Sequence, residues 1–564
     1  MKKITPSVII LVGIASLCFI LTSIGLSYGI PQKYIGDEYV QVAIALKMLE
    51  EKAVTPNFPE IFYHQPLSAY ISLFGIGGFL SIEMIFGIFK NLAELRTFYS
   101  INSTNLLIVV RLISVLLSTA TIFLVYAIGK NLFSKKAGFI AAFFWATSFL
   151  SVYIHHSGRV WSYISFFIAL SFLWSTKLLH NKSTKTYIKA GIGTVLSAAM
   201  LLPGILTIFP TLIAGWNGGK KKLFILGTVV FLGLVLIIAI NPRGLGVVFH
   251  RFQIFLDSSA TQIFTGGIHG NPLPKTPILN RVFDPFKTLF SYDPIYFILA
   301  FIGGYLLLKN DKKKFILLSS FPIAFYLFIG PLFAYGWVSR TLIPFMIYIV
   351  IFGAYAAVEL IKKIKIENNK TLVGIIFLLA LPSLTFSVLF DAKLLTKDTR
   401  TEAIDWVYKN LPENTKIITF SHTNEVINQN REILEMIEKF APEKLDTRQR
   451  TLLASGDKSY PKPFYAAWDA RTIGIDILPE DFFKKENFEY YIKTDWGGSI
   501  PNQESLEKTF LSKELIVWFS PFKSLADSYA PERFLNVHNM TNPLSALFSV
   551  NHPGPVVEIY KVKF

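Results

Sequence analysis

The chain has few of the residues that build disulfide-linked, highly charged or nucleotide-binding proteins. Its 564 residues include one cysteine, Cys18, inside an apolar run, so neither a disulfide framework nor a cysteine-based metal site can form. Charged residues make up only 16% of the chain, against 52% hydrophobic residues. We find no repeat, low-complexity tract or glycine-rich phosphate loop. This composition is typical of a polytopic membrane protein rather than a soluble one.

The excess of positive charge does not indicate a nucleic-acid partner. The formal net charge is +17, but the lysines lie in short connections between apolar runs and form no single basic face with interleaved aromatics. The lipid bilayer is therefore the expected surroundings of most of the chain.

The apolar runs predict an α-helical polytopic membrane protein with about 11 transmembrane helices. The first run, Ser7 to Ile30, carries no charge and is long enough to cross roughly 30 Å of hydrocarbon. No signal-cleavage pattern closes it before Tyr28, so it is expected to be a retained anchor. The expected spans are 7–30, 106–128, 138–154, 160–179, 187–200, 204–216, 223–241, 292–308, 315–333, 341–361 and 371–390.

Lysine placement predicts the orientation in a plasma membrane. Alternate connections are rich in lysine and nearly free of acids, which is typical of cytoplasmic loops. The amino terminus is then cytoplasmic, while residues 31–105, 242–291 and everything after 390 lie outside. The basic connections contain Lys130, Lys135, Lys136, Lys182, Lys185, Lys189, Lys220, Lys221, Lys222, Lys309, Lys312, Lys313, Lys314, Lys362, Lys363, Lys365 and Lys370.

Two regions complicate this count. Residues 66–89 are apolar enough to span, but a crossing there would turn every lysine cluster outward, so we expect an interfacial or re-entrant helix on the outer face. The spans 187–200 and 204–216 are short, and merging them would reverse the carboxyl-terminal half.

Residues 1–390 are thus expected to form the membrane domain and residues 391–564 an extracytoplasmic soluble domain with an α/β or α+β fold. Thr399 to Glu402 reads as a capping box that opens a helix ending near Asn410. Strands are expected at 416–420, 515–519 and 556–562.

An acid pair, Asp37 and Glu38, follows Gly36 where the first apolar run leaves the membrane. Three arginines, Arg111, Arg159 and Arg340, are expected at the same outer face, where the short turns contain no lysine. Arginine binds phosphate in a bidentate way and is less costly to desolvate than lysine. Acids that merely flank a helix and arginines that bind lipid head groups generically are the alternatives.

Further candidates lie in two outer segments. Tyr63, His64 and Gln65 precede Pro66 at the start of the expected interfacial helix, and His269 lies in the 242–291 loop. That loop is either a lid or donor-binding loop or an ordinary outer connection.

These motifs resemble those of the GT-C type multi-pass glycosyltransferases that use a polyprenyl- or dolichyl-phosphate sugar donor, such as protein O-mannosyltransferases and lipid A aminoarabinose transferases. The resemblance covers about the first 410 residues. It rests on Asp37-Glu38, on Tyr63 to Leu67, on Gly129 to Phe133, on Arg340 to Phe345, and on Lys397 to Val407.

The resemblance implies inverting transfer of a sugar from a polyprenyl-phosphate-linked donor to a lipid, glycan or protein acceptor outside the cell. Asp37 would be the general base, with Glu38 beside it. Tyr63, His64, Gln65, Arg111, Arg159, Arg340 and His269 would bind donor phosphate or substrate. A divalent cation held by Glu38 or His64 is left open, and no other cofactor is expected.

The chain departs from the family in two places. The acid that often follows the arginine after the third span is absent from Arg159 to Ile164, and Gln65 stands where the aminoarabinose transferase has lysine. A polytopic oligosaccharide polymerase or ligase, a transporter, and an inactive relative therefore remain alternatives.

Overall fold

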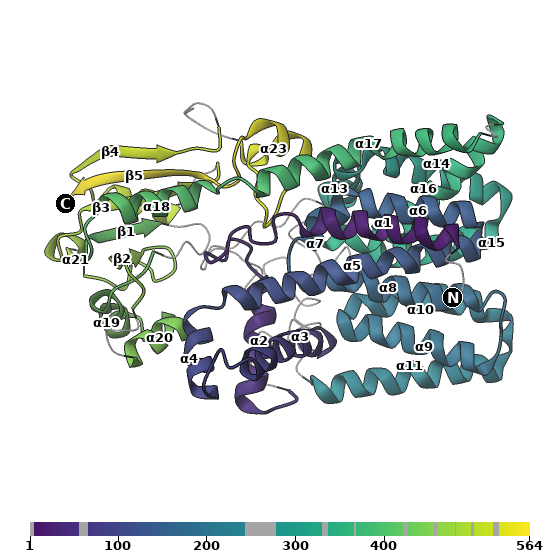
Figure 1. The fold of residues 1–564 in the computed structure, drawn as a ribbon, viewed down its shortest axis with the longest axis horizontal. Helices are drawn as coiled ribbons and strands as arrows, with labels where there is room; N and C mark the ends of the chain where they lie inside the picture. The colour runs from purple at the N-terminus through teal and green to yellow at the C-terminus, as the bar shows by residue number, and fades with distance from the viewer. Residues whose placement is uncertain are drawn as a thin grey trace.

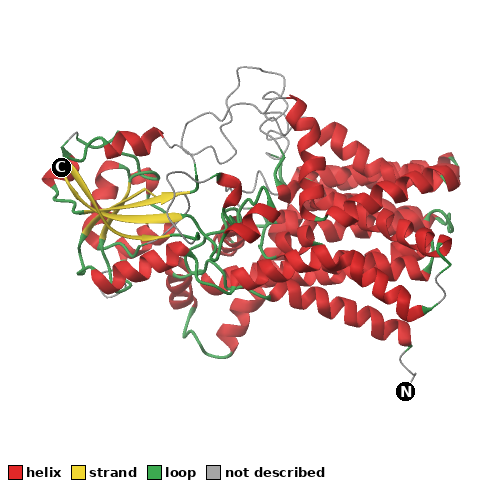
Figure 2. Ribbon diagram, turned by 90° about the horizontal axis from the view of Figure 1, so that it is seen from above, coloured by secondary structure: helices red, strands yellow, loops and turns green. Residues whose placement is uncertain are grey.

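The structure is a computed structural model that describes residues 5–55, 66–242, 278–329, 337–365, 368–420, 427–455, 460–479, 481–497, 501–522 and 530–564. It has two parts, a helical bundle and a smaller mixed sheet with its own helices, which lie at opposite ends of the long axis (Figures 1 and 2).

The bundle contains a helix at every segment that the sequence predicts as a span. Its helices are α1 (Pro6–Ser23), α5 (Thr104–Leu132), α6 (Lys135–Thr147), α7 (Phe149–His155), α8 (Val160–Lys177), α9 (Thr184–Met200), α10 (Ile208–Gly215), α11 (Lys220–Ile240), α13 (Ile278–Tyr292), α14 (Pro294–Asn310), α15 (Lys312–Ala324), α16 (Ile343–Lys363) and α17 (Asn369–Leu394).

Length and composition alone identify fewer spans than the eleven predicted. Among the described residues, six helices are long and apolar enough to cross a membrane, or up to eight if two bent helix pairs each count as one span. The predicted spans that do not meet these criteria of length and composition are α8, α9, α10 and α15. Helices α9, α10 and α15 have 17, 8 and 13 residues. The chain is thus an integral membrane protein by its helices, while the number of crossings stays a prediction.

Three helices lie at the sheet-facing end of the bundle: α2 (Glu38–Glu51), α3 (Pro66–Ile85) and α4 (Leu92–Ile101) (Figure 1). Helix α3 coincides with the segment expected to be interfacial, although by length and composition it could also span. Its carboxyl end is tied to α4, because the Tyr99 hydroxyl donates to the buried Glu83 carboxylate at 2.7 Å. Whether α3 crosses or lies along the membrane stays a prediction.

A buried carboxylate, Asp293, organises two bends in the bundle. It lies between α13 and α14, which meet at 117°, and it accepts hydrogen bonds from the Ser148 hydroxyl and from the backbone N–H groups of Phe149 and Leu150. These groups belong to the amino-terminal end of α7, which bends from α6 by 53°. An anion at a helix amino terminus is favourable. Asp293 therefore fixes the direction of α7, which leads to Arg159.

The smaller part contains a five-stranded mixed sheet in the order β2-β1-β3-β5-β4. Strand β1 pairs in parallel with β2 and β3, whereas β5 runs antiparallel to β3 and β4. The strands are β1 (Lys416–Phe420), β2 (Ala466–Asp469), β3 (Tyr490–Asp495), β4 (Ser512–Phe519) and β5 (Val556–Lys563). Its helices are α18 (Thr399–Asn410), α19 (Arg431–Phe440), α20 (Thr447–Ala454), α21 (Phe482–Lys485), α22 (Pro501–Glu507) and α23 (Pro543–Ser549).

Strand β1 lies between two apolar layers. Ile417 packs in one cluster with Val407 of α18, and Ile418 packs in another with Leu434 of α19. Successive side chains of a strand point to opposite faces, so a run such as Ile417-Ile418 predicts a strand covered on both sides.

The start of α18 differs from the sequence expectation in one detail. The helix covers Thr399–Asn410 as expected, but Asp398 is its N-cap, with its carboxylate accepting from the Arg400 N–H at 2.9 Å. The Thr399 hydroxyl instead donates to the Pro555 carbonyl. The capping-box assignment to Thr399 was therefore wrong by one position, because Asp398 offers the stronger acceptor.

Candidate active site

The two adjacent acids at the start of α2 lie in different surroundings. Glu38 is fully buried, and its carboxylate accepts from Arg111 Nε at 3.0 Å, from Arg111 Nη2 at 2.5 Å and from the Gly158 N–H at 3.2 Å. Arg111 is also fully buried, and its Nη1 donates to the carbonyls of Leu26 and Tyr28. This bidentate ion pair ties the segment between α1 and α2 to α5 and to the turn before α8.

Asp37, by contrast, is accessible. Its side chain is 49% exposed, and Oδ2 lies 3.4 Å from Nη2 of Arg340, whose side chain is 22% exposed. Arg340 lies in the 3₁₀ turn Ser339–Leu342 that precedes α16. The separation is long for a hydrogen bond, so Asp37 and Arg340 form a loose ion pair.

Arg159 is bound by a residue of the carboxyl-terminal part. Its Nη1 donates to the His538 carbonyl at 2.9 Å, and its Nη2 donates to His538 Nδ1 at 2.8 Å. Arg159 is only 4% exposed, and its Nε finds no hydrogen-bond partner among the described residues. A buried guanidinium with an unsatisfied N–H is costly unless a further acceptor arrives.

The imidazole of His538 has a defined tautomer. Nδ1 accepts from Arg159 and also from the backbone N–H of Gly36 at 3.0 Å, so the proton of the neutral ring is on Nε2. Burial, followed by the positive charge of Arg159, lowers the pKa of His538 to about 3. His538 is therefore neutral at physiological pH.

The segment that carries His538 is inserted into the bundle. The Met540 N–H donates to the Tyr153 hydroxyl at 2.8 Å, and the Met540 carbonyl accepts from the Tyr292 hydroxyl at 2.6 Å. Phe534, Leu535 and Met540 are buried in the same apolar cluster as the transmembrane helices. The carboxyl-terminal part is thus not a separate body beyond residue 390, since it shares the core of the membrane domain.

Gly36 permits this approach. A Cβ at position 36 would lie 2.7 Å from His538 Cε1 and 3.0 Å from Nδ1, closer than real Cβ atoms come to such neighbours. The sequence analysis noted Gly36 only as the residue before the acids. The close packing of His538 explains why a residue without a side chain stands there.

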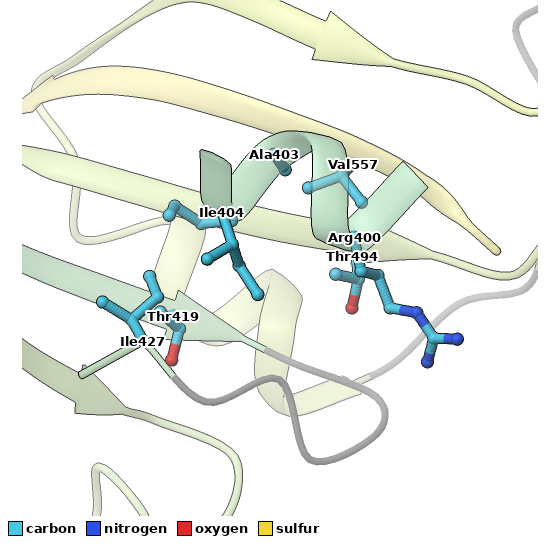
Figure 3. A pocket seen from close by; sticks show the side chains of 8 residues that line it. Arg400, Ala403, Ile404, Thr419, Ile427, Thr494 and Val557 are labelled. Carbon is cyan, nitrogen blue, oxygen red and sulfur yellow. The ribbon is translucent and has the colours of Figure 1, made fainter. Parts of the chain in front are cut away.

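A second contact holds the start of α18 against the segment between α1 and α2. The Tyr28 hydroxyl donates to Asp398 at 2.6 Å, and the Arg400 guanidinium lies 3.6 Å above the ring of Tyr34. Arg400 also borders a cavity of about 20 Å³ between α18 and the sheet (Figure 3). This cavity has room for one water molecule and is too small for a sugar.

Four of the expected site residues, Tyr63, His64, Gln65 and His269, lie outside the described residues. Of the others, Asp37 and Arg340 form an ion pair, and the charges of both act on Arg159. Glu38 and Arg111 form a separate, fully buried ion pair. Sequence reasoning missed His538, because nothing in Asn536 to Met540 distinguishes it from a surface segment.

The described residues do not by themselves provide a cation site. No three His, Cys, Asp or Glu side chains converge in the part of the chain that the structure describes. Both Glu38 oxygens accept from Arg111, and Asp37 forms an ion pair with Arg340. The arrangement suits an anion beside an exposed carboxylate.

No family model and no curated protein matches the chain. Among solved structures it is similar to the Archaeoglobus fulgidus oligosaccharyltransferase in the apo form, at 12% identity over 93% of this chain and 74% of that one, with a TM-score of 0.46. It is also similar to ArnT from Cupriavidus metallidurans in the apo state, at 10% identity over 98% of this chain and 97% of that one, with a TM-score of 0.45. ArnT bound to undecaprenyl phosphate is matched at 11% identity over 90% and 96% of the two chains, with a TM-score of 0.44. Likeness at this level does not assign a function, so the function rests on the geometry of the site.

Proposed function

We propose that the protein is a membrane glycosyltransferase that moves a sugar from a polyprenyl-phosphate-linked donor to an acceptor hydroxyl, with Asp37 as the general base. One observation carries the proposal: a half-exposed carboxylate loosely paired with Arg340, beside a buried Arg159 whose Nε lacks a described partner. These groups match the two demands of the reaction, a proton acceptor and fixed positive charge for a departing phosphate.

The transfer is balanced without a covalent enzyme intermediate. The acceptor oxygen attacks the anomeric carbon, its proton passes to the Asp37 carboxylate, and the bond between the anomeric carbon and the phosphate oxygen breaks. The electron pair of that bond leaves with the polyprenyl phosphate. Attack from the side opposite the leaving group inverts the anomeric centre. The proton leaves Asp37 for water when the product departs.

The arginines stabilise the leaving group. Arg159 is directed by two hydrogen bonds to His538 and keeps Nε for a further acceptor. Arg340 is shared between Asp37 and an incoming phosphate, and its move toward the phosphate releases Asp37 to take a proton. A guanidinium in a desolvated site stabilises developing phosphate charge more than it would in water.

We also propose that the site faces the outside, with the amino terminus in the cytoplasm. The lysine-rich connections α5–α6, α10–α11 and α14–α15 lie at the end of the bundle remote from the sheet and the site (Figure 1). Lysine marks the cytoplasmic side. A reporter fused after Lys314 that reads the outside would contradict this orientation.

The test is transfer by the purified protein in lipid nanodiscs supplied with radiolabelled polyprenyl-phosphate sugars. Asp37→Asn keeps the shape of the side chain, so we expect donor binding to persist while transfer falls by about two to four orders of magnitude. Glu51→Gln, at the far end of the same helix, is the matched control and should transfer normally. Full activity of Asp37→Asn would overturn the assignment of the base. Movement of intact sugar-lipid without transfer would indicate a transporter instead.

A further inference from the structure

His538 comes from the carboxyl-terminal part, yet it contacts two elements of the proposed site. Its Nδ1 accepts from the Gly36 N–H, one residue before the base, and from Nη2 of Arg159. We propose that His538 is a positioning residue that sets the direction of the Arg159 guanidinium and of the turn presenting Asp37, so that docking of the carboxyl-terminal segment completes the site. This inference rests on the proposed glycosyltransferase function.

The geometry explains why histidine suits this position. The side chain has to present one unprotonated nitrogen to two donors at once, and neutral imidazole does so while its ring fills the space beside a glycine. Lysine or arginine would bring a second cation against Arg159. The charged groups that act on the ring are Arg159, Asp37, Arg340 and Arg400, of which three are positive, so the protonated ring is disfavoured.

The backbone around His538 is fixed independently of the imidazole. The His538 N–H donates to the Asn536 side chain at 2.9 Å, and Met540 is bound at both its N–H and its carbonyl by Tyr153 and Tyr292. The His538 carbonyl also receives Arg159 Nη1. Two of the links between the segment and the site therefore depend on the imidazole, while the docking of the segment has other supports. A side-chain substitution should alter the site before it undocks the segment.

The imidazole acts on the reaction through Arg159 and the Gly36–Asp37 peptide. With Nη2 held by His538 Nδ1, the plane of the guanidinium is fixed and Nε–H is left for the phosphate. Without the imidazole the guanidinium can rotate about its last bonds, and the Gly36 N–H loses its acceptor. Misplacement of a charge-stabilising group by about 1 Å costs as much as 10²-fold in rate.

The experiment compares His538→Asn with His538→Ala in the full-length protein. The Asn side-chain oxygen can take the place of Nδ1 as acceptor, whereas Ala offers no acceptor. We expect His538→Ala to lower kcat by about tenfold to hundredfold with a smaller change in KM, and His538→Asn to restore most of kcat. His552→Asn, in the same part of the chain, is the matched control and should behave as wild type.

Two results would overturn the inference. If both variants have normal kcat per folded molecule, His538 has only a structural role. If His538→Asn is as impaired as His538→Ala while both remain folded, the active group is Nε2–H, not Nδ1. Thermal unfolding of each variant in the same nanodiscs supplies the folded fraction.

A measurement without substrate separates this inference from the proposed function. In protein labelled with ¹⁵N-histidine, the signals of His538 are those that disappear in His538→Asn. Between pH 7 and pH 5 these signals should show an unprotonated Nδ1 and a protonated Nε2. The opposite tautomer or a charged ring would refute the positioning role even in an active enzyme. The expected tautomer in a protein that transfers no sugar would instead refute the proposed function.

Discussion

Asp37 and Glu38 are neighbours in the chain and have the same chemical group, but the structure uses them differently. The Glu38 side chain is 0% exposed, and its two oxygens accept from Nε and Nη2 of Arg111, while the Asp37 side chain is 49% exposed and lies 3.4 Å from Arg340. A carboxylate whose oxygens are all occupied cannot take a proton from a substrate. The comparison teaches that burial and partner geometry, not residue type, separate an enclosed acid from an accessible one.

The largest expected difference between the two acids is in the stability that is lost when each side chain is removed. Glu38→Ala leaves Arg111 buried without its counter-ion, so the free energy of unfolding should fall by about 3–5 kcal/mol. Asp37→Ala should change it by less than about 1 kcal/mol, because an exposed pair contributes little. Urea or thermal unfolding in nanodiscs measures both.

The double variant Glu38→Met with Arg111→Met is the control for charge. It removes both ions and keeps an apolar side chain of similar volume at each position, so much of the lost stability should return. If the double variant is less stable than Glu38→Ala alone, the pair contributes more than mutual neutralisation, and the contacts of Arg111 with the loop carbonyls would be the reason.

A smaller effect separates Arg340 and Arg159 from Arg111. Arg340→Lys and Arg159→Lys keep the charge but lose the planar fork, so the affinity for radiolabelled polyprenyl phosphate should fall roughly tenfold in each. Arg111→Lys should instead lower the folded fraction, with the affinity of the remaining folded protein less affected. Unchanged donor affinity in both Arg340→Lys and Arg159→Lys would mean that these arginines bind ordinary lipid head groups.

A further effect concerns pH dependence. Burial lowers the pKa of His538 from 6.5 to about 3, so the unfolded chain binds more protons than the folded one between these values. The stability that His538 contributes is complete above pH 6.5 and declines as the pH falls toward 3. The difference in melting temperature between wild type and His538→Asn should therefore shrink from pH 7.5 to pH 5. A difference that is constant over this range would contradict the neutral ring.

The sequence was sufficient for features that depend on local pattern. The helix at 399–410 and the strands at 416–420, 515–519 and 556–562 were predicted within a few residues, because periodicity and turn residues mark them. The sequence could not distinguish Asp37 from Glu38, since adjacent residues share every local signal. Their difference arises from Arg111, which lies 73 positions from Glu38. Arg159 was predicted as a site residue, but its partner His538 was not.

The bond between Gly36 and His538 joins residues that are 502 positions apart in the chain. All the transmembrane helices are synthesised before His538 leaves the ribosome, so a nascent chain has the acids and arginines without the imidazole that binds Arg159 and the Gly36 N–H. Contacts of such high sequence separation form late, because they close a long loop. Completion of the site is therefore coupled to completion of translation, and any product that ends before residue 538 lacks an ordered Arg159 however well its helices insert.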